Sequence, residues 1–387
     1  MTLKRNSKLF LVLFLGTLSA FGPFVTDLYL PALPTMSSYF NSSTSTIQLT
    51  LTGSMVGLAL GQLLIGPISD KYGRKNPLII SLIVYLISTI AIILFPNVYA
   101  MIVLRFIQGV SSAGAVVISR AISTDLYHGR ELAAFFALLM AVNGLAPILS
   151  PILGSILLEL TDWRGIFVTL ALIGVILLAV SFKFNESLAI EKRLDLPITK
   201  TYYSIVHVAK NRLFFALVII QGFALATMFA YIAASPFILQ THYSLSPLMY
   251  SLCFGLNGFA IVLGSKSAGN FKEKISIKLG LSLMLLVSIY LAVALTLTLP
   301  FLFIEVGFFL LLLGLGFILP AGSAIAMSLE RERAGSASAF FGFVPFFLGG
   351  VVSPLVGIGN IFHSSAIAIV ICSTISFMTF KLVEKKI

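Results

Sequence analysis

Residues 9–29 read LFLVLFLGTLSAFGPFVTDLY, an apolar stretch whose single charged side chain is Asp27. A bilayer core about 30 Å thick is crossed by roughly 20 apolar residues in a helix. A run of this length therefore predicts a membrane-spanning helix. Apolar residues continue past Ala20, through Phe24 and Tyr29, which favours an uncleaved first helix over a signal peptide.

The rest of the chain has the same composition. Of its 387 residues, 58% are hydrophobic and only 10% are charged, and the mean hydropathy is +1.06. These values lie far from those of soluble proteins and predict an integral membrane protein. A barrel is excluded, because its strands alternate apolar and polar residues, whereas these runs are apolar all round.

About twelve apolar stretches of spanning length are joined by short polar breaks. The predicted fold is an all-α membrane protein of twelve helices. The predicted spans are 8–30, 46–68, 76–96, 98–124, 131–158, 163–183, 211–240, 246–267, 276–298, 300–327, 334–358 and 361–381.

The longest polar connection follows the sixth predicted span. It divides the chain into an N-terminal six-helix bundle at 1–183, a cytoplasmic linker at 184–210 and a C-terminal six-helix bundle at 211–387. Twelve helices without a large soluble domain fit a secondary transporter, in which two pseudo-symmetric halves hold the substrate between them at mid-membrane.

The cations predict the orientation. All but Arg105 and Arg164 of the 25 Lys and Arg residues fall at the ends or breaks on the side of the N-terminus. Short loops rich in Lys and Arg stay in the cytoplasm, so we expect both termini there, in a bacterial inner membrane. The net charge of +11 then reflects topology and contact with anionic lipid, not nucleic-acid binding.

The connection between the second and third spans reads GQLLIGPISDKYGRK, Gly61–Lys75. Small residues here, with Ser54 and Gly57 before them, permit close helix approach. The segment resembles the cytoplasmic signature of the major facilitator superfamily. That resemblance implies that Asp70 and Arg74 latch the cytoplasmic face in the outward-facing state, whereas the alternative is ordinary topology charge. The residues assigned to this motif are Gly61, Gly66, Asp70, Gly73, Arg74 and Lys75.

Three further segments narrow the resemblance. They are FGPFVTDLYLPALP at Phe21–Pro34, RFIQGVSSAGAVVISRAISTDLY at Arg105–Tyr127 and NGLAPILSPILG at Asn143–Gly154. Together they resemble the bicyclomycin-resistance (Bcr/CflA) branch of the drug:proton antiporters, across nearly the whole first half. The second half matches more loosely.

Asp27 and Arg105 are the candidates for proton coupling, with Gln108 as a partner of Arg105. A carboxylate within a bilayer is costly and is rarely kept unless it handles ions, protons or substrate. Burial and a nearby cation act in opposite directions on such a carboxyl, so helix movement can switch its protonation. The alternatives are a structural carboxylate at a helix break near Pro31 and an interfacial Arg105 that extends to the membrane surface.

Pro147 and Pro151 lie one turn apart with Gly144 and Gly154 around them. This spacing removes backbone hydrogen bonds and lets another helix pack closely. The segment resembles the superfamily's antiporter motif, although Ala146 stands where that motif has glycine. Proline kinks also occur in unrelated membrane helices.

Glu305 is the second acid inside a predicted span. It is either a proton or cation site or an interfacial residue. An apolar, aromatic cavity would suit amphipathic substrates. The candidate lining residues are Tyr29, Asn143, Tyr231, Asn257 and Glu305, each of which is equally suited to helix packing.

The predicted function is proton-coupled efflux of small amphipathic molecules by a drug:H⁺ antiporter. The alternatives on the same fold are a dedicated siderophore or metabolite exporter and a proton-coupled uptake symporter. An enzyme or receptor is not favoured, because no cluster of catalytic side chains or soluble domain is evident. Cys253 and Cys372 have no paired spacing. We expect no metal or cofactor, a proton gradient as the driving force, lipids as neighbours and a monomer.

Overall fold

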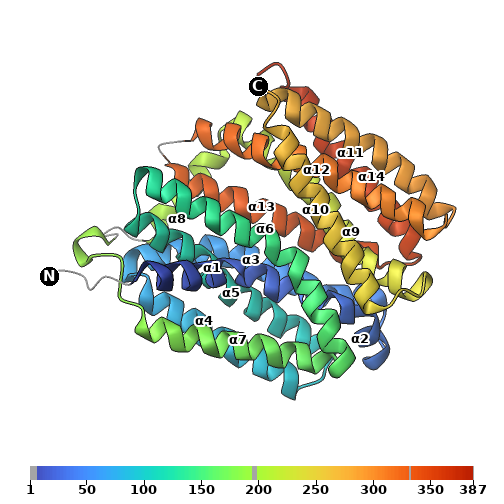
Figure 1. The fold of residues 1–387 in the computed structure, drawn as a ribbon. Coiled ribbons are helices and arrows are strands. Elements are labelled where there is room, and N and C mark those ends of the chain that lie inside the picture. Colours follow the sequence, from blue (N-terminus) through green and yellow to red (C-terminus); the bar gives the residue numbers. More distant parts are fainter. Residues whose placement is uncertain (1–6, 194–197, 331–332, 387) are drawn as a thin grey trace. The chain divides into compact units, whose positions relative to one another are not determined.

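The computed structural model describes residues 7–193, 198–330 and 333–386, and every regular element within them is helical. Figure 1 shows their arrangement along the chain. The elements are α1 (Lys8–Asp27), η1 (Leu30–Ala32), α2 (Leu33–Tyr39), α3 (Thr44–Tyr72), α4 (Lys75–Leu94), α5 (Val98–Leu126), α6 (Gly129–Leu160), α7 (Trp163–Lys183), η2 (Ile190–Lys192), α8 (Ile198–Ala209), α9 (Arg212–Pro236), η3 (Phe237–His242), α10 (Pro247–Ala268), α11 (Glu273–Thr296), α12 (Phe301–Leu329), α13 (Ala334–Val356) and α14 (Ile361–Val383).

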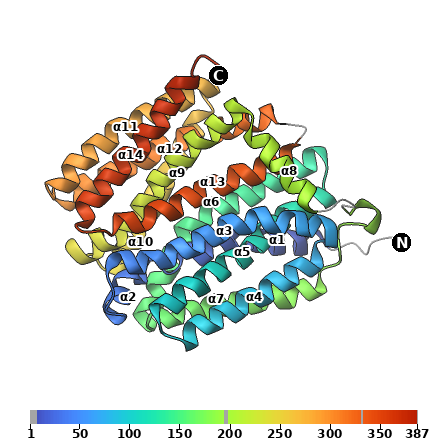
Figure 2. The ribbon, with the colours of Figure 1, turned by 180° about the vertical axis from the view of Figure 1, so that it is seen from behind.

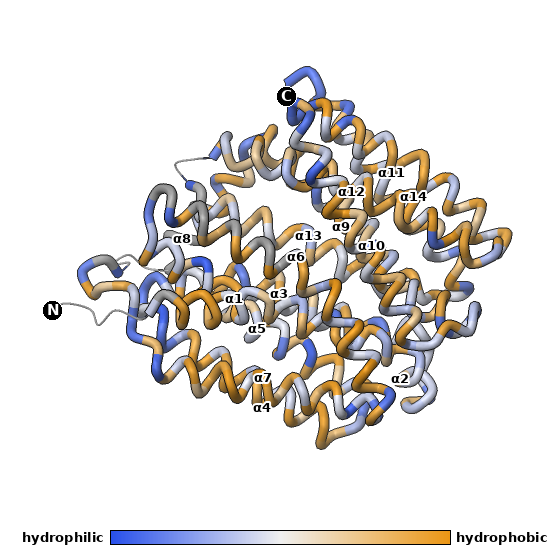
Figure 3. Tube along the Cα trace, viewed as in Figure 1, coloured by the Kyte–Doolittle hydropathy of each residue, from blue (hydrophilic) through white to orange (hydrophobic). Residues whose placement is uncertain are grey.

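The long helices have the length and composition of membrane spans. Within the described residues, 11 helices meet both criteria, and the apolar part of α6 adds a shorter helix at Gly144–Leu160. Figure 3 shows apolar residues along these helices and hydrophilic residues gathered near their ends and in the connections. The predicted all-α membrane fold is confirmed.

Helix ends follow the local chemistry of the chain. Asn97 precedes α5 and accepts hydrogen bonds from the backbone N–H groups of Tyr99 and Ala100, at 2.9 and 3.1 Å. Asp162 caps α7 in the same way, through the N–H of Arg164 at 2.9 Å. Such caps satisfy donors that the first helical turn leaves unpaired.

Several short elements lie outside the predicted spans or alter them. The first span ends at Asp27, and Pro31 and Pro34 lie in the short helices η1 and α2 that follow. The seventh span continues past Pro236 as the π-helix η3. The predicted linker 184–210 contains the amphipathic helix α8.

The chain forms two units by its internal contacts. Unit 1 comprises Met1–Tyr29 and Gly53–Thr201, and unit 2 comprises Leu30–Thr52 and Tyr202–Ile387. The division between Thr201 and Tyr202 falls inside the predicted linker. The segment Leu30–Thr52 groups with unit 2, where the Gln48 amide donates to the Ala233 carbonyl oxygen at 2.8 Å.

In unit 1, α1 packs against α5 and α6, and α4 packs against α5 and α7. Both views show α4 beside α7 (Figures 1 and 2). Glycines bring α3 against α5, because a Cβ added at Gly57 would overlap the Phe106 carbonyl oxygen and one at Gly61 would lie 2.5 Å from that of Val110. The predicted close approach at these residues is confirmed.

In unit 2, α12 packs against α9, α10 and α11, and α9 also packs against α13 and α14. Both views place α11 beside α14. Glycines again permit short distances between helix axes. A Cβ added at Gly280 would lie 2.6 Å from the Gly314 carbonyl oxygen. The helices α9, α10 and α12 carry the side chains of the polar cluster described below.

Candidate functional site

Asp27 is the last residue of α1, and its side chain is buried, with 9% of the residue exposed. The neighbouring Thr26 hydroxyl is bonded back to the Gly22 carbonyl oxygen at 3.2 Å. The C-terminal end of a helix carries partial negative charge, so an ionised carboxylate at this position gains nothing from α1. The following helix, α2, has no side-chain cap at its N-terminus. The alternative of a structural carboxylate at the helix break near Pro31 stays a prediction.

Arg105 lies on α5, and the residue has no exposed surface. Its Nη1 donates to Gln108 Oε1 at 2.6 Å, and Gln108 Nε2 donates to the Thr89 hydroxyl on α4 at 2.7 Å. The predicted partnership of Arg105 and Gln108 is confirmed. The interfacial alternative for Arg105 is wrong, because a side chain that reaches the membrane surface would be exposed.

Aromatic rings cover the Arg105 guanidinium. Its central carbon lies 4.2 Å from the centroid of the Tyr29 ring and 5.7 Å from that of Phe167. A cation held over a ring face in a desolvated site gains about 2 kcal/mol or more. Tyr29, predicted to line a substrate cavity, is fully buried against this cation. The site thus holds a fixed positive charge at the end of α1.

The guanidinium is incompletely satisfied. Nε and Nη2 of Arg105 are buried and have no hydrogen-bond partner. The charge of Arg105 interacts electrostatically with the Asp27 carboxyl. A buried donor without an acceptor costs about 1–3 kcal/mol, and more when the group is charged. Arg105 is therefore prepared to accept an anionic partner that this structure leaves at a distance.

The antiporter segment on α6 approaches α1 next to Asp27. A Cβ added at Gly154 would overlap the carbonyl oxygen of Leu28, the residue after Asp27. Close packing is restricted to that end of the motif, since a Cβ at Gly144 would meet nothing within 4 Å. Pro147 and Pro151 both lie inside the continuous helix α6. The side chain of Asn143 lies outside the described part of the chain.

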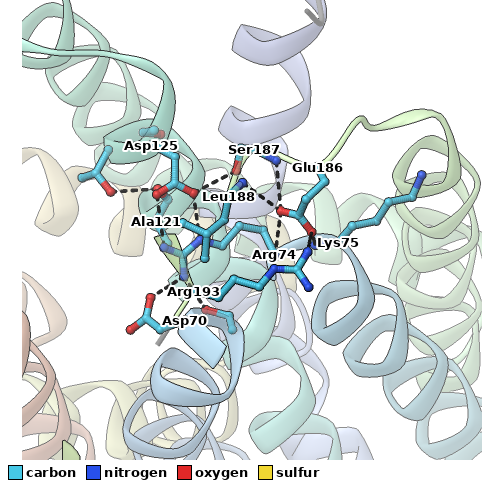
Figure 4. A network of polar contacts seen from close by, with 12 residues as sticks. Asp70, Arg74, Lys75, Ala121, Asp125, Glu186, Ser187, Leu188 and Arg193 are labelled. Carbon is cyan, nitrogen blue, oxygen red and sulfur yellow. Dashed lines mark hydrogen bonds and ion pairs between the residues drawn. The ribbon is translucent and has the colours of Figure 1, made fainter. Parts of the chain in front are cut away.

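A second polar network holds the ends of α3, α4 and α5 in unit 1, and Figure 4 shows its side chains. Arg74 donates from Nη1 to Asp70 Oδ1 at 2.5 Å, and from Nε to Asp125 Oδ2 at 2.9 Å. Burial opposes the charged form, but the bonds and charges of Asp125 and Asp70 raise the pKa of Arg74 above its usual value. Arg74 therefore stays charged although it is buried. The predicted contact of Asp70 with Arg74 is confirmed.

Glu186, not Asp70, meets the helix N-terminus in this network. Its two carboxylate oxygens accept from the backbone N–H groups of Arg74 at 2.9 Å and Lys75 at 3.1 Å, where the helix dipole favours negative charge. Figure 4 shows Glu186 and Ser187 beside the start of α4. The motif's Gly73 has a φ of +88°, which L side chains rarely adopt. A Cβ at Gly66 would lie 3.6 Å from Val117, an ordinary contact.

Asp125 and Glu186 were not predicted as functional residues. Their partner, Arg74, is 51 residues away from Asp125 and 112 residues away from Glu186 in sequence. The one available signal is scarcity, because the chain has only 14 acids.

Unit 2 contains a third buried polar cluster. Asn257 Nδ2 on α10 donates to Glu305 Oε1 on α12 at 2.9 Å and to the Tyr231 hydroxyl on α9 at 3.1 Å. Glu305 is 5% exposed, which does not fit an interfacial residue. Three of the predicted cavity residues therefore meet one another, whereas Tyr29 lies with Arg105 in unit 1.

Similarity to known proteins identifies the family of this chain. The family model described as Major Facilitator Superfamily matches residues 9–354. The uncharacterized MFS-type transporter YdgK of Bacillus subtilis (strain 168) is 36% identical over 362 residues, which cover 92% of this chain and 90% of that protein. The bicyclomycin resistance protein homolog of Haemophilus influenzae is 27% identical, over 70% of this chain and 69% of the relative.

A solved structure shares the fold. The xylose transporter XylE from E. coli, in a partially occluded inward open conformation, superposes with a TM-score of 0.73 at 13% sequence identity. The match covers 97% of each chain. This likeness concerns the arrangement of helices alone.

Proposed function

The chain belongs to the Major Facilitator Superfamily, and from that premise we propose that it exports small amphipathic molecules in exchange for protons. The proposal rests on one observation above others: a buried carboxyl, Asp27, shares its surroundings with a buried arginine that has unpartnered donors. A charged pair that is not fully bonded is a costly arrangement. Such an arrangement suits a site whose charge changes during transport.

Proton binding at Asp27 supplies the coupling step in this proposal. When the carboxyl is ionised, it offers Arg105 an anionic partner; when it is protonated, that attraction is lost. The two protonation states therefore favour different positions of α1 relative to α5, which carries Arg105. Substrate binding displaces the proton from Asp27. Protons that enter the cell down their gradient thereby drive substrate out of it. The name of the Haemophilus influenzae relative supports a drug as substrate.

The packing of α6 against α1 supports antiport. Gly154 places the α6 backbone against Leu28, so a change in α6 is transmitted directly to the residue after Asp27. The prolines at 147 and 151 remove hydrogen bonds that would otherwise stiffen α6. We propose that this pair of helices couples proton release to the movement that exposes the substrate.

The network around Arg74 has a structural part in the proposed cycle. It joins α3, α4, α5 and the segment after α7 within unit 1. We assign it the role of holding these helix ends as one body while the transporter changes state. The positive-inside distribution of Lys and Arg supports both termini in the cytoplasm of a bacterial cell, with lipid around a monomer.

Proton exchange in everted membrane vesicles tests the proposal. Addition of a transported compound is expected to release protons from wild-type vesicles, and Asp27→Asn is expected to abolish that release. Glu159→Gln is the matched control, because Glu159 is an exposed acid near the end of α6. The proposal fails if Asp27→Asn exchanges protons at the wild-type rate. Asp27→Glu keeps the carboxyl and should retain partial exchange.

A panel of cationic, neutral and acidic compounds distinguishes export of drugs from the narrower alternatives. Efflux of several unrelated amphipathic compounds supports the proposal. Efflux confined to one siderophore or metabolite indicates a dedicated exporter. Accumulation of a compound together with protons indicates an uptake symporter on the same fold.

A further inference from the structure

The cluster of Glu305, Asn257 and Tyr231 in unit 2 is not used by the proton site at Asp27. Its three side chains come from three different helices, α12, α10 and α9, and all are buried. Aromatic rings surround it, since the Tyr231 ring centroid lies 4.7 Å from that of Phe308 and 5.8 Å from that of Phe254. A carboxyl group in such surroundings needs a specific explanation.

The cluster contains acceptors without a hydrogen-bond partner. Both amide hydrogens of Asn257 are used, by Glu305 Oε1 and by the Tyr231 hydroxyl oxygen. Two buried acceptors, Glu305 Oε2 and Asn257 Oδ1, have no hydrogen-bond partner. The Cys253 thiol is a further but weak donor to this carboxyl, so an ionised Glu305 would carry its charge with one amide hydrogen bond. A proton added to the Glu305 carboxylate would supply a hydrogen-bond donor and also remove its negative charge.

Within the described residues, none of the side chains found to act on Glu305 is basic. The titratable groups that interact with it or with its partners are Cys253 and Tyr250 on α10 and Tyr231 on α9. On α11, the Tyr290 hydroxyl donates to the Phe303 carbonyl oxygen, and α13 contains no titratable residue. The cation of α10, Lys266, is nine residues beyond Asn257, which is about 14 Å of helix. None of the groups in contact is cationic at neutral pH.

We propose that the Glu305 carboxyl is a second proton-binding site of this transporter, additional to Asp27. The proton bonds to Oε2, comes from water and returns to water, and no other bond forms or breaks. Asn257 is a positioning residue that holds Oε1 and stabilises the ionised form after the proton leaves. A hard metal cation fits this site less well than a proton. Such a cation is coordinated by six or more oxygen atoms, and the cluster offers far fewer.

Infrared difference spectroscopy of the purified protein in lipid tests the assignment without any transported substrate. The carbonyl stretching band of a protonated carboxylic acid should appear and disappear as pH is changed. Glu305→Gln should remove one such band, and Asp27→Asn should leave that band in place. Failure of Asp27 as the transport coupling site would thus not affect this result. Glu305→Gln resembles the protonated form in shape, so the variant should keep the wild-type thermal stability.

A second variant keeps the test decisive even if Glu305→Gln does not fold. Asn257→Ala removes the hydrogen bond to Oε1 and should shift the midpoint of the Glu305 band to higher pH by about one to two units, the equivalent of one hydrogen bond to a charged group. The proposal is overturned if no titrating band depends on residue 305 or 257. It is also overturned if Na⁺ removes the band at constant pH, since the ligand would then be a metal ion.

Discussion

Arg105 is a full positive charge surrounded by protein, and three of its contacts explain how it stays there. Gln108 accepts one hydrogen bond, and the rings of Tyr29 and Phe167 face its guanidinium carbon at 4.2 and 5.7 Å. All three contacts depend on the planar shape of the guanidinium. A flat, delocalised cation can stack on aromatic rings and, at the same time, donate hydrogen bonds from its edge. A lysine ammonium has the charge but not this shape.

We expect Arg105→Lys to reduce transport by about 10- to 100-fold with little loss of folded protein. The bond to Gln108 is a hydrogen bond to a charged group, worth about 1.5–3 kcal/mol, and each 1.4 kcal/mol is tenfold. Efflux of a transported compound from cells measures the effect. Arg164→Lys is the control, since Arg164 is partly exposed and pairs with Asp162. Wild-type efflux by Arg105→Lys would show that charge alone is sufficient.

The two acids bound to Arg74 differ in burial and should differ in their contribution to stability. The Asp125 side chain is 12% exposed, whereas that of Asp70 is 49% exposed. Removing one partner of a buried pair costs about 3–5 kcal/mol, whereas an exposed pair is worth about 0–1 kcal/mol. Asp125→Asn should therefore lower the Tm of the purified protein much more than Asp70→Asn. Equal shifts would contradict the role of burial.

At the scale of the elements, helix spans were predictable and tertiary partners were not. Apolar runs of spanning length placed every long helix to within a few residues, because solvation by lipid acts on each segment independently. The end of α1 at Asp27 and the π-helix η3 depend on prolines whose effect is local but varied. Nothing in the sequence pairs Asp125 or Glu186 with Arg74, since those contacts exist only after α3, α4 and α5 pack.

The same distinction applies to the predicted cavity residues. The sequence marks Tyr231, Asn257 and Glu305 separately, as polar or aromatic residues within spans, and the structure joins them by hydrogen bonds. Tyr29 is a candidate on the same grounds, but its ring covers the Arg105 guanidinium. The sequence identified which side chains are costly to bury, because that property belongs to the residue. It did not identify which partners compensate them.

The contact between α6 and α1 gives the sharpest prediction for an element. Gly154→Ala should impair transport, because its methyl group would overlap the Leu28 carbonyl oxygen and force α6 away from the residue after Asp27. Overpacking of this kind costs about 1–3 kcal/mol. Gly144→Ala on the same helix is the matched control, with nothing within 4 Å of the new Cβ. Proton release in everted vesicles compares the two variants, and equal activity would remove α6 from the coupling step.

At the scale of the whole molecule, one buried acid lies within a membrane-spanning helix of each unit, and the two acids have different partners. Asp27 in unit 1 lies near a cation, whereas Glu305 in unit 2 is bonded to an amide. The internal contacts that define each unit enclose its own acid. If both carboxyls release a proton in each cycle, the charge moved per substrate depends on both units. That charge is measurable without knowledge of the conformations involved.

The dependence of substrate accumulation on membrane voltage therefore distinguishes transport coupled to one proton from transport coupled to two. Each elementary charge that crosses 100 mV supplies about 2.3 kcal/mol, which equals roughly a 40-fold difference in the substrate gradient. For a neutral compound in everted vesicles held at 100 mV, Glu305→Gln should lower the steady-state accumulation about 40-fold. Asp27→Asn should abolish accumulation altogether. An unchanged gradient in Glu305→Gln would mean that the proton on Glu305 stays bound throughout the cycle, so that Asp27 alone couples transport to the membrane potential.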